Sequence, residues 1–174
     1  ALEALQKMAS RLVNDRSQSL PRSAFDGSEA VIQRLASQGV LKPTNGQLSF
    51  AHQTLGDNLA IRQPLERGKT LQQFIRDHPP LPFIRPSVRS FFFYLRANEP
   101  DQFRRQVWTV LDDDSIRYHL RRLVVESLSE VQPTGQDWPL LRRLFNQYED
   151  LFRRFFDRIQ SREWIEHLRK NWLS

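Results

Sequence analysis

The Asn45-Gly46 turn constrains the fold of this chain more than any other feature. It marks a hairpin in a sequence whose apolar residues otherwise recur mostly at helical spacing. Asn-Gly readily adopts the left-handed backbone angles of a two-residue hairpin turn. Residues 40–41 precede the turn as a short apolar pair, and Leu48 and Phe50 alternate with polar residues after it. We therefore predict a small β-hairpin that ends near Phe50.

Helical patterns flank this hairpin. Residues 2–13 and 28–38 each carry apolar side chains at helical spacing, and Gly39 stands where a left-handed residue would end the second helix. Residues 53–62 give a further helix directly after the hairpin. Two helices, a two-stranded wing and a third helix make a winged-helix layout, which we place at residues 1–65.

Residues 66–174 consist largely of helical runs separated by polar turns such as Asn98-Glu99-Pro100. Five of these runs cover residues 85–97, 101–111, 115–131, 138–160 and 161–173. Short helices joined by polar turns favour antiparallel pairs stacked side by side, as in an α-solenoid, with a compact bundle as the alternative. The predicted fold is therefore mainly α: an N-terminal winged helix with one small β-hairpin, followed by a solenoid-like α-helical array.

The composition excludes several kinds of function. The chain has no cysteine, which rules out disulfides, thiolate metal ligands and a cysteine nucleophile. This suits the cytoplasm, where we expect the protein. Mean hydropathy is −0.59 and no run reaches the roughly 20 apolar residues of a membrane span, so we expect no membrane partner. The first residue is Ala rather than Met, and we expect a fragment of a longer polypeptide.

His52 lies where the predicted strand ends and the next helix begins. A neutral imidazole donates one hydrogen bond and a protonated imidazole donates two, and a nearby phosphate favours the protonated form. His52 could therefore bind an anion. It could also be half-buried and bond to a backbone carbonyl of the wing. Local chemistry leaves both interpretations open.

The segment LSFAHQTLGDNLAIR, residues 48–62, resembles the end of the winged-helix domain in signal-transduction ATPases with numerous domains, the NACHT-type and apoptotic-ATPase-type switches. In that family a strand ending Phe-x-His runs into a helix with a hydroxyl residue, an apolar residue, an acidic residue, an aromatic residue and small residues. The matching positions here are Phe50, His52, Thr54, Leu55, Asp57, Asn58, Ala60 and Ile61. Asn58 stands where an aromatic residue is usual, and Ile61 where a second alanine is common.

The resemblance implies a nucleotide-dependent switch. In the family, the winged helix folds back on a nucleotide-binding domain, its histidine contacts the β-phosphate of ADP, and exchange for ATP releases it. If this chain follows the same pattern, as the resemblance implies, His52 would sense ADP. We expect a regulatory and interaction fragment whose partners are an upstream nucleotide-binding domain of the same chain and a protein bound by the helical array. The fragment would hold no cofactor, and ADP or ATP would bind the parent chain.

The chain offers no self-contained catalytic site. Gly68-Lys69-Thr70 lacks the earlier glycine of a phosphate-binding loop, since position 63 is Gln63, and it follows a helix instead of a buried strand. No Ser or Thr has surroundings that suggest a nucleophile. We therefore expect this fragment not to be an enzyme.

The sequence also disfavours a metal site. The carboxylate cluster at residues 112–114 lacks the alternating spacing of a calcium loop, and we expect Asp114 or Ser115 to be the N-cap of the next helix instead. The four histidines are far apart in the sequence. No His pair has the spacing of helical metal ligands.

A DNA-binding winged helix with a helical oligomerisation region is the alternative. Its recognition helix would be residues 28–38, with Gln33 and Arg34 as base or phosphate contacts and Lys42 on the wing. These few cations neutralise phosphate poorly, so nucleic acid is the less favoured partner. A third option is a passive helical adaptor in which the winged unit is only a cap.

Overall fold

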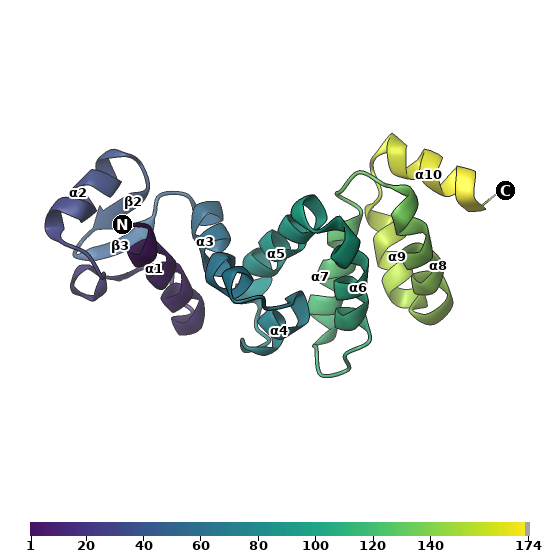
Figure 1. The fold of residues 1–174 in the computed structure, drawn as a ribbon, viewed down its shortest axis with the longest axis horizontal. Helices are drawn as coiled ribbons and strands as arrows, with labels where there is room; N and C mark the ends of the chain where they lie inside the picture. The colour runs from purple at the N-terminus through teal and green to yellow at the C-terminus, as the bar shows by residue number, and fades with distance from the viewer. Residues whose placement is uncertain (173–174) are drawn as a thin grey trace. The chain divides into compact units, whose positions relative to one another are not determined.

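The computed structural model describes residues 1–172 and divides into two compact units. Unit 1 is residues 1–91 and unit 2 is residues 92–174, so the division falls within helix α5 (Arg85–Asn98). Helices predominate in both units, and the strands form one small antiparallel sheet in unit 1 (Figure 1). The predicted mainly α fold with one small hairpin is confirmed.

Unit 1 combines the sheet with helices on either side of it in the sequence. Before the hairpin come α1 (Leu2–Asp15), β1 (Leu20–Pro21), a 3-10 turn at Arg22–Ala24 and α2 (Glu29–Ser37). The hairpin is β2 (Leu41–Thr44) and β3 (Gln47–Phe50), and α3 (Gln53–Glu66), α4 (Leu71–Arg76) and a 3-10 turn at Pro82–Ile84 follow. Helix α1 packs against α3 with Leu5, Met8 and Leu12 buried. The predicted winged-helix boundary at residue 65 lies in the last turn of α3.

The hairpin turn has the predicted left-handed geometry. Asn45 has φ 49° and Gly46 has φ 76°, and Leu41 pairs with Phe50 across the two strands. Gly39, with φ 69°, follows the end of α2 as expected. The turn chemistry of these residues therefore fixes where the chain reverses.

A third strand, β1, was not predicted. Leu20 pairs with Leu48, which makes a three-stranded sheet in the order β1-β3-β2. Pro21 and Pro43 both lie on edge strands, where a residue without an N–H is tolerated. The strand is only two residues long, so it carries no alternating pattern that a sequence reading could detect.

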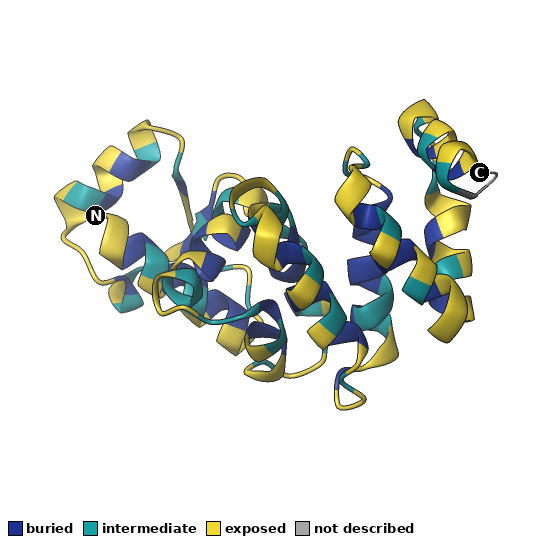
Figure 2. Ribbon diagram, turned by 45° about the vertical axis from the view of Figure 1, so that its right-hand side comes forward, coloured by how far each residue is buried: buried dark blue, intermediate teal, exposed yellow. Residues whose placement is uncertain are grey.

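Unit 2 is helical throughout its described part. It contains the end of α5, α6 (Pro100–Leu111), α7 (Tyr118–Leu128), a 3-10 turn at Gly135–Asp137, α8 (Trp138–Gln147), α9 (Glu149–Arg158) and α10 (Arg162–Trp172). Helix α6 packs on α7, α8 packs on α9, and α7 also packs on α9 (Figure 1). Along α8, α9 and α10 buried residues recur at helical spacing among exposed ones, whereas residues 123–128 of α7 are all buried (Figure 2). The final predicted run extends to residue 173, which lies outside the described residues.

Two helix boundaries in unit 2 differ from the sequence prediction. The run at 138–160 is two helices, because Tyr148 leaves the helical region at φ −136°, ψ 58°. The predicted N-cap at Asp114 or Ser115 is wrong, since α7 begins at Tyr118 after Arg117. Asp113 instead accepts hydrogen bonds from the Ser115 backbone N–H at 2.9 Å and its hydroxyl at 2.5 Å. The carboxylate therefore closes a local turn ahead of the helix.

Candidate functional site

His52 is the N-cap residue of α3, with an extended backbone at φ −125° and ψ 120°. Its side chain is exposed and makes no capping hydrogen bond. Within residues 1–172 the imidazole has no hydrogen-bond partner, so it is not tied to a backbone carbonyl of the wing. The imidazole is therefore exposed beside a helix N-terminus, where backbone N–H groups favour anions.

The backbone on each side of His52 is firmly held. The Ala51 N–H donates to the Val40 carbonyl at 3.0 Å, and Leu55 N–H donates to the His52 carbonyl at 3.1 Å. Phe50, the last residue of β3, is 9% exposed. The fold thus fixes the backbone of His52 while leaving its side chain unused.

Gly56 lets α3 approach Phe50 closely. A Cβ at this position would lie 2.7 Å from Cδ2 of the Phe50 ring, which is closer than ordinary van der Waals contact allows. Gly56 is not among the residues on which the sequence prediction rests. A glycine inside a helical pattern is nevertheless a recognisable sign of such close packing.

Asp57, the acidic position of the family pattern, is buried with 7% exposure. The Ser87 hydroxyl, from the start of α5, donates to its Oδ1 at 3.4 Å, and Gln53 also hydrogen-bonds to it. Burial raises the pKa of Asp57 above its ordinary value, and the two hydrogen bonds oppose that rise. Asp57 therefore links α3 to the following part of unit 1 and is shielded from solvent.

The two departures from the family pattern have different surroundings. Asn58 is exposed, so a polar side chain replaces the usual aromatic residue without burying an amide. Ile61 is 3% exposed and belongs to the core together with Leu59 and Ala60. The apolar side of α3 is therefore intact, and the solvent side carries His52 and Asn58.

The residues of the DNA-binding alternative lie on other elements. Gln33 and Arg34 are exposed on α2, and Lys42 is exposed on β2. Glu29, one turn before Gln33, accepts a hydrogen bond from Gln33 at 3.3 Å and from Arg22 at 2.8 Å. Arg34, the only arginine of α2, therefore shares this helix with the carboxylate of Glu29.

Gly68-Lys69-Thr70 leads into α4, and Thr70 is the N-cap residue of that helix. The Thr70 hydroxyl accepts from the Gln73 N–H at 3.2 Å, and the Gln73 side chain accepts from the Thr70 N–H at 2.9 Å. This reciprocal pair is a capping box. Lys69 forms an ion pair with Asp77. The triplet therefore leads into a helix and holds Lys69 against a carboxylate.

Residues 1–172 contain no group of three or more His, Asp or Glu side chains placed to hold a metal ion. None of the described helices combines the length and apolar character needed to cross a membrane.

Comparison of the chain with protein-family models, with curated proteins and with solved structures gives no match. The family resemblance of residues 48–62 and the ADP-sensing role of His52 therefore stay predictions.

Proposed function

We propose that this chain is a regulatory and interaction module of a nucleotide-dependent switch, in which the winged helix binds an ADP-loaded nucleotide-binding domain through His52. The supporting observation is the exposed His52 imidazole, which has no hydrogen-bond partner within residues 1–172 and is held at the N-terminus of α3. A side chain that the fold positions but does not use is available for an external ligand.

The chemistry of this position suits a phosphate. A protonated imidazole donates from both nitrogens, and the N-terminal end of α3 adds the positive end of the helix dipole. A ligand shifts an equilibrium only by its differential affinity for the two states. His52 would therefore act by binding the ADP state more tightly than the ATP state, with a coupling of about 1–3 kcal/mol typical of such switches.

Unit 2 offers a surface for the second partner, a protein. Phe145 at the end of α8 is 47% exposed and Phe156 on α9 is 59% exposed. The ring centroid of Phe152 lies 5.3 Å from that of Phe145 and 6.4 Å from that of Phe156. Exposed neighbouring aromatic side chains are typical of protein-binding surfaces. This supports an interaction role for the helical array.

Duplex DNA is the competing target of the winged helix. It would need Arg34 and Lys42 to contact phosphate, yet Glu29 presents a carboxylate on the same helix as Arg34. A helix entering the major groove would bring that carboxylate towards the phosphates. The charge distribution on α2 therefore favours the switch over DNA binding.

The test uses the polypeptide encoded by the complete reading frame. We would purify the wild type and His52→Ala and quantify the ADP that accompanies each protein. Gln47→Ala is the matched control, because Gln47 is an exposed polar residue of the same β3 strand. We expect ADP with the wild type and the control, and at least about tenfold less with His52→Ala, as for loss of one charged hydrogen bond.

Two results would overturn the proposal. Equal ADP in His52→Ala and the wild type would make His52 a surface residue of the wing. A wild type without nucleotide would remove the switch altogether. Tight, salt-sensitive binding to duplex DNA that disappears in Arg34→Ala and Lys42→Ala would establish the alternative instead.

A further inference from the structure

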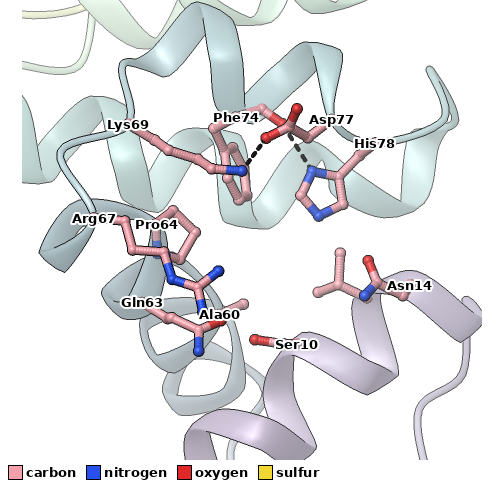
Figure 3. A pocket seen from close by; sticks show the side chains of 11 residues that line it. Ser10, Asn14, Ala60, Gln63, Pro64, Arg67, Lys69, Phe74, Asp77 and His78 are labelled. Atoms are coloured by element: carbon pink, nitrogen blue, oxygen red, sulfur yellow. Dashed lines mark hydrogen bonds and ion pairs between the residues drawn. The ribbon is translucent and has the colours of Figure 1, made fainter.

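Unit 1 contains an open cavity of about 240 Å³ bounded by α1, α3, α4 and the connection between the last two (Figure 3). Its polar lining includes Ser10 and Asn14 from α1, Gln63 from α3 and Arg67 just after it. His52 is not part of it. No local sequence pattern marks this site, because its residues lie far apart in the chain.

Four polar side chains of this cavity lack partners among the described residues. Among residues 1–172, the side chains of Ser10, Asn14, Gln63 and Arg67 form no hydrogen bond or ion pair. Figure 3 shows the Arg67, Gln63 and Ser10 side chains gathered on one side of the hollow and Asn14 opposite, near His78. These four side chains therefore border a shared space that the fold does not fill. Such a convergence of polar groups in a concave site is typical of a ligand site.

The charge of the lining selects the ligand. Lys69 is paired with Asp77, so these two charges offset one another. Nδ1 of His78 lies 2.7 Å from the Phe74 carbonyl oxygen. Because a carbonyl only accepts, Nδ1 carries the hydrogen and Nε2 is left for the cavity. The Arg67 guanidinium is then the surplus fixed charge, which favours an anion with a single negative charge.

Arg67 also selects the shape of that anion. A guanidinium presents a planar set of donors that matches a carboxylate with two parallel hydrogen bonds. Dianionic phosphate fits less well, because the single unpaired charge of Arg67 would balance only one of its two negative charges. A carboxylate is therefore the better match for this combination of charges.

The other lining residues indicate which groups the ligand carries besides its carboxylate. Val13, Ala60 and Pro64 provide an apolar wall for a short carbon skeleton. Ser10 and Asn14 provide hydroxyl and amide groups that can bond to a hydroxyl or amino substituent. The volume is below the roughly 300–1,000 Å³ of pockets for drug-sized ligands, so the ligand has few non-hydrogen atoms.

We propose that this cavity binds a small hydroxy- or amino-carboxylic acid, with the carboxylate on Arg67 and the polar substituent facing α1. The site stands apart from His52 and does not depend on the proposed switch. Ligand binding here would join α1, α3 and the start of α4 through one small molecule.

The test is a titration of the 174-residue chain, followed through its backbone amide NMR signals. The probes are lactate, serine, acetate and inorganic phosphate at constant ionic strength. We expect lactate or serine to give saturable shifts at Asn14, Gln63 and Arg67, with acetate and phosphate binding more weakly. Arg67→Gln should weaken binding by about tenfold or more, as expected for loss of a charged hydrogen-bond donor.

Arg62→Gln is the matched control, because Arg62 is an exposed arginine of α3 and pairs with Glu66, neither residue being in the cavity lining. It should leave the affinity unchanged. Asn14→Leu is a second variant, at an exposed position where the larger apolar side chain would obstruct the cavity without disturbing the core. We expect it to abolish binding while the amide spectrum outside the cavity stays as in the wild type.

The possible contrary results are distinct. Absence of saturable shifts with all four probes would overturn the site. Equal weakening by Arg67→Gln and Arg62→Gln would show a general charge effect and overturn it as well. Tighter binding of phosphate than of lactate and serine would overturn the carboxylate assignment. None of these outcomes depends on the nucleotide content of a longer polypeptide, so the two proposals fail separately.

Discussion

At the residue scale, Asp57 makes the stability of unit 1 depend on pH. Burial raises its pKa above the ordinary value of 3.8, so the folded chain keeps the Asp57 proton to a higher pH than the unfolded chain does. The resulting stabilisation is fully present at pH values below the pKa that Asp57 has in the unfolded chain. It is lost as the pH rises through the pKa that Asp57 has in the folded chain. At higher pH the buried, charged carboxylate lowers the free energy of unfolding by an amount that no longer changes with pH.

Asp57→Asn should remove this loss of stability with rising pH. We expect the variant to match the wild type in free energy of unfolding near pH 3 and to exceed it at pH 7, because the amide carries no charge to bury. Urea unfolding across that pH range measures the difference. Asp157→Asn is the control, because it replaces an exposed aspartate of α9 by the same amide. A parallel pH profile for Asp57→Asn and the wild type would contradict the assigned cause.

At the element scale, the packing of α3 on β3 depends on Gly56. Glycine-to-alanine changes inside helices usually stabilise by about 1 kcal/mol. Here the added Cβ would lie 2.7 Å from the buried Phe50 ring. We expect Gly56→Ala to lower the free energy of unfolding by about 1–3 kcal/mol, as for other overpacked sites.

Gly135→Ala provides the comparison for this prediction. A Cβ at Gly135 meets nothing within 4 Å, and the residue starts a 3-10 turn without a left-handed φ. We expect a change close to zero there. Equal stability of Gly56→Ala and the wild type would mean that Phe50 can move aside at little cost.

The elements that were foreseen are those with strong local chemistry. The Asn45-Gly46 turn and Gly39 fix backbone angles by themselves, so the hairpin and the end of α2 were predictable. The break at Tyr148 was not, because no proline or glycine marks it and the flanking residues keep their helical pattern. Local signals therefore identify most elements, and packing decides where some of them end.

The candidate site was only partly predictable for the same reason. The sequence placed His52 at the start of a helix, and the structure has it there. Its exposure depends on how β3 and α3 pack, which no local pattern reports. The cavity around Arg67 depends on the pairing of α1 with α3, whose sequences are separated by the entire sheet. Sites assembled from distant segments require the tertiary structure.

At the scale of the whole molecule, the two compact units can be observed separately. The four tryptophans are Trp108, Trp138, Trp164 and Trp172, all in the sequence of unit 2. Tryptophan fluorescence therefore reports unit 2, whereas far-UV circular dichroism reports the helices of both units. A variant that disturbs one unit should affect these two signals differently.

Arg96→Met supplies such a disturbance. Arg96 donates to both carboxylate oxygens of Asp137, at 2.5 Å and 2.7 Å, and also to the Gln132 carbonyl at 2.7 Å. Asp137 is 2% exposed, so removing Arg96 leaves a buried carboxylate without its counter-charge. We expect a loss of about 3–5 kcal/mol, as for other broken buried ion pairs, with methionine keeping the contact to the Phe103 ring.

The two probes then decide whether each unit unfolds by itself. Arg96→Met should lower the fluorescence midpoint in urea while leaving a separate part of the circular dichroism transition near its wild-type position. Gly56→Ala, in unit 1, should lower the urea midpoint of part of the circular dichroism transition and leave the fluorescence midpoint near its wild-type value. Its clash lies with Phe50, and no tryptophan is near it in the sequence. If both variants move both signals together, the chain unfolds as one cooperative unit despite its two cores. In that case a ligand in the cavity of unit 1 would also protect the tryptophans of unit 2 against unfolding.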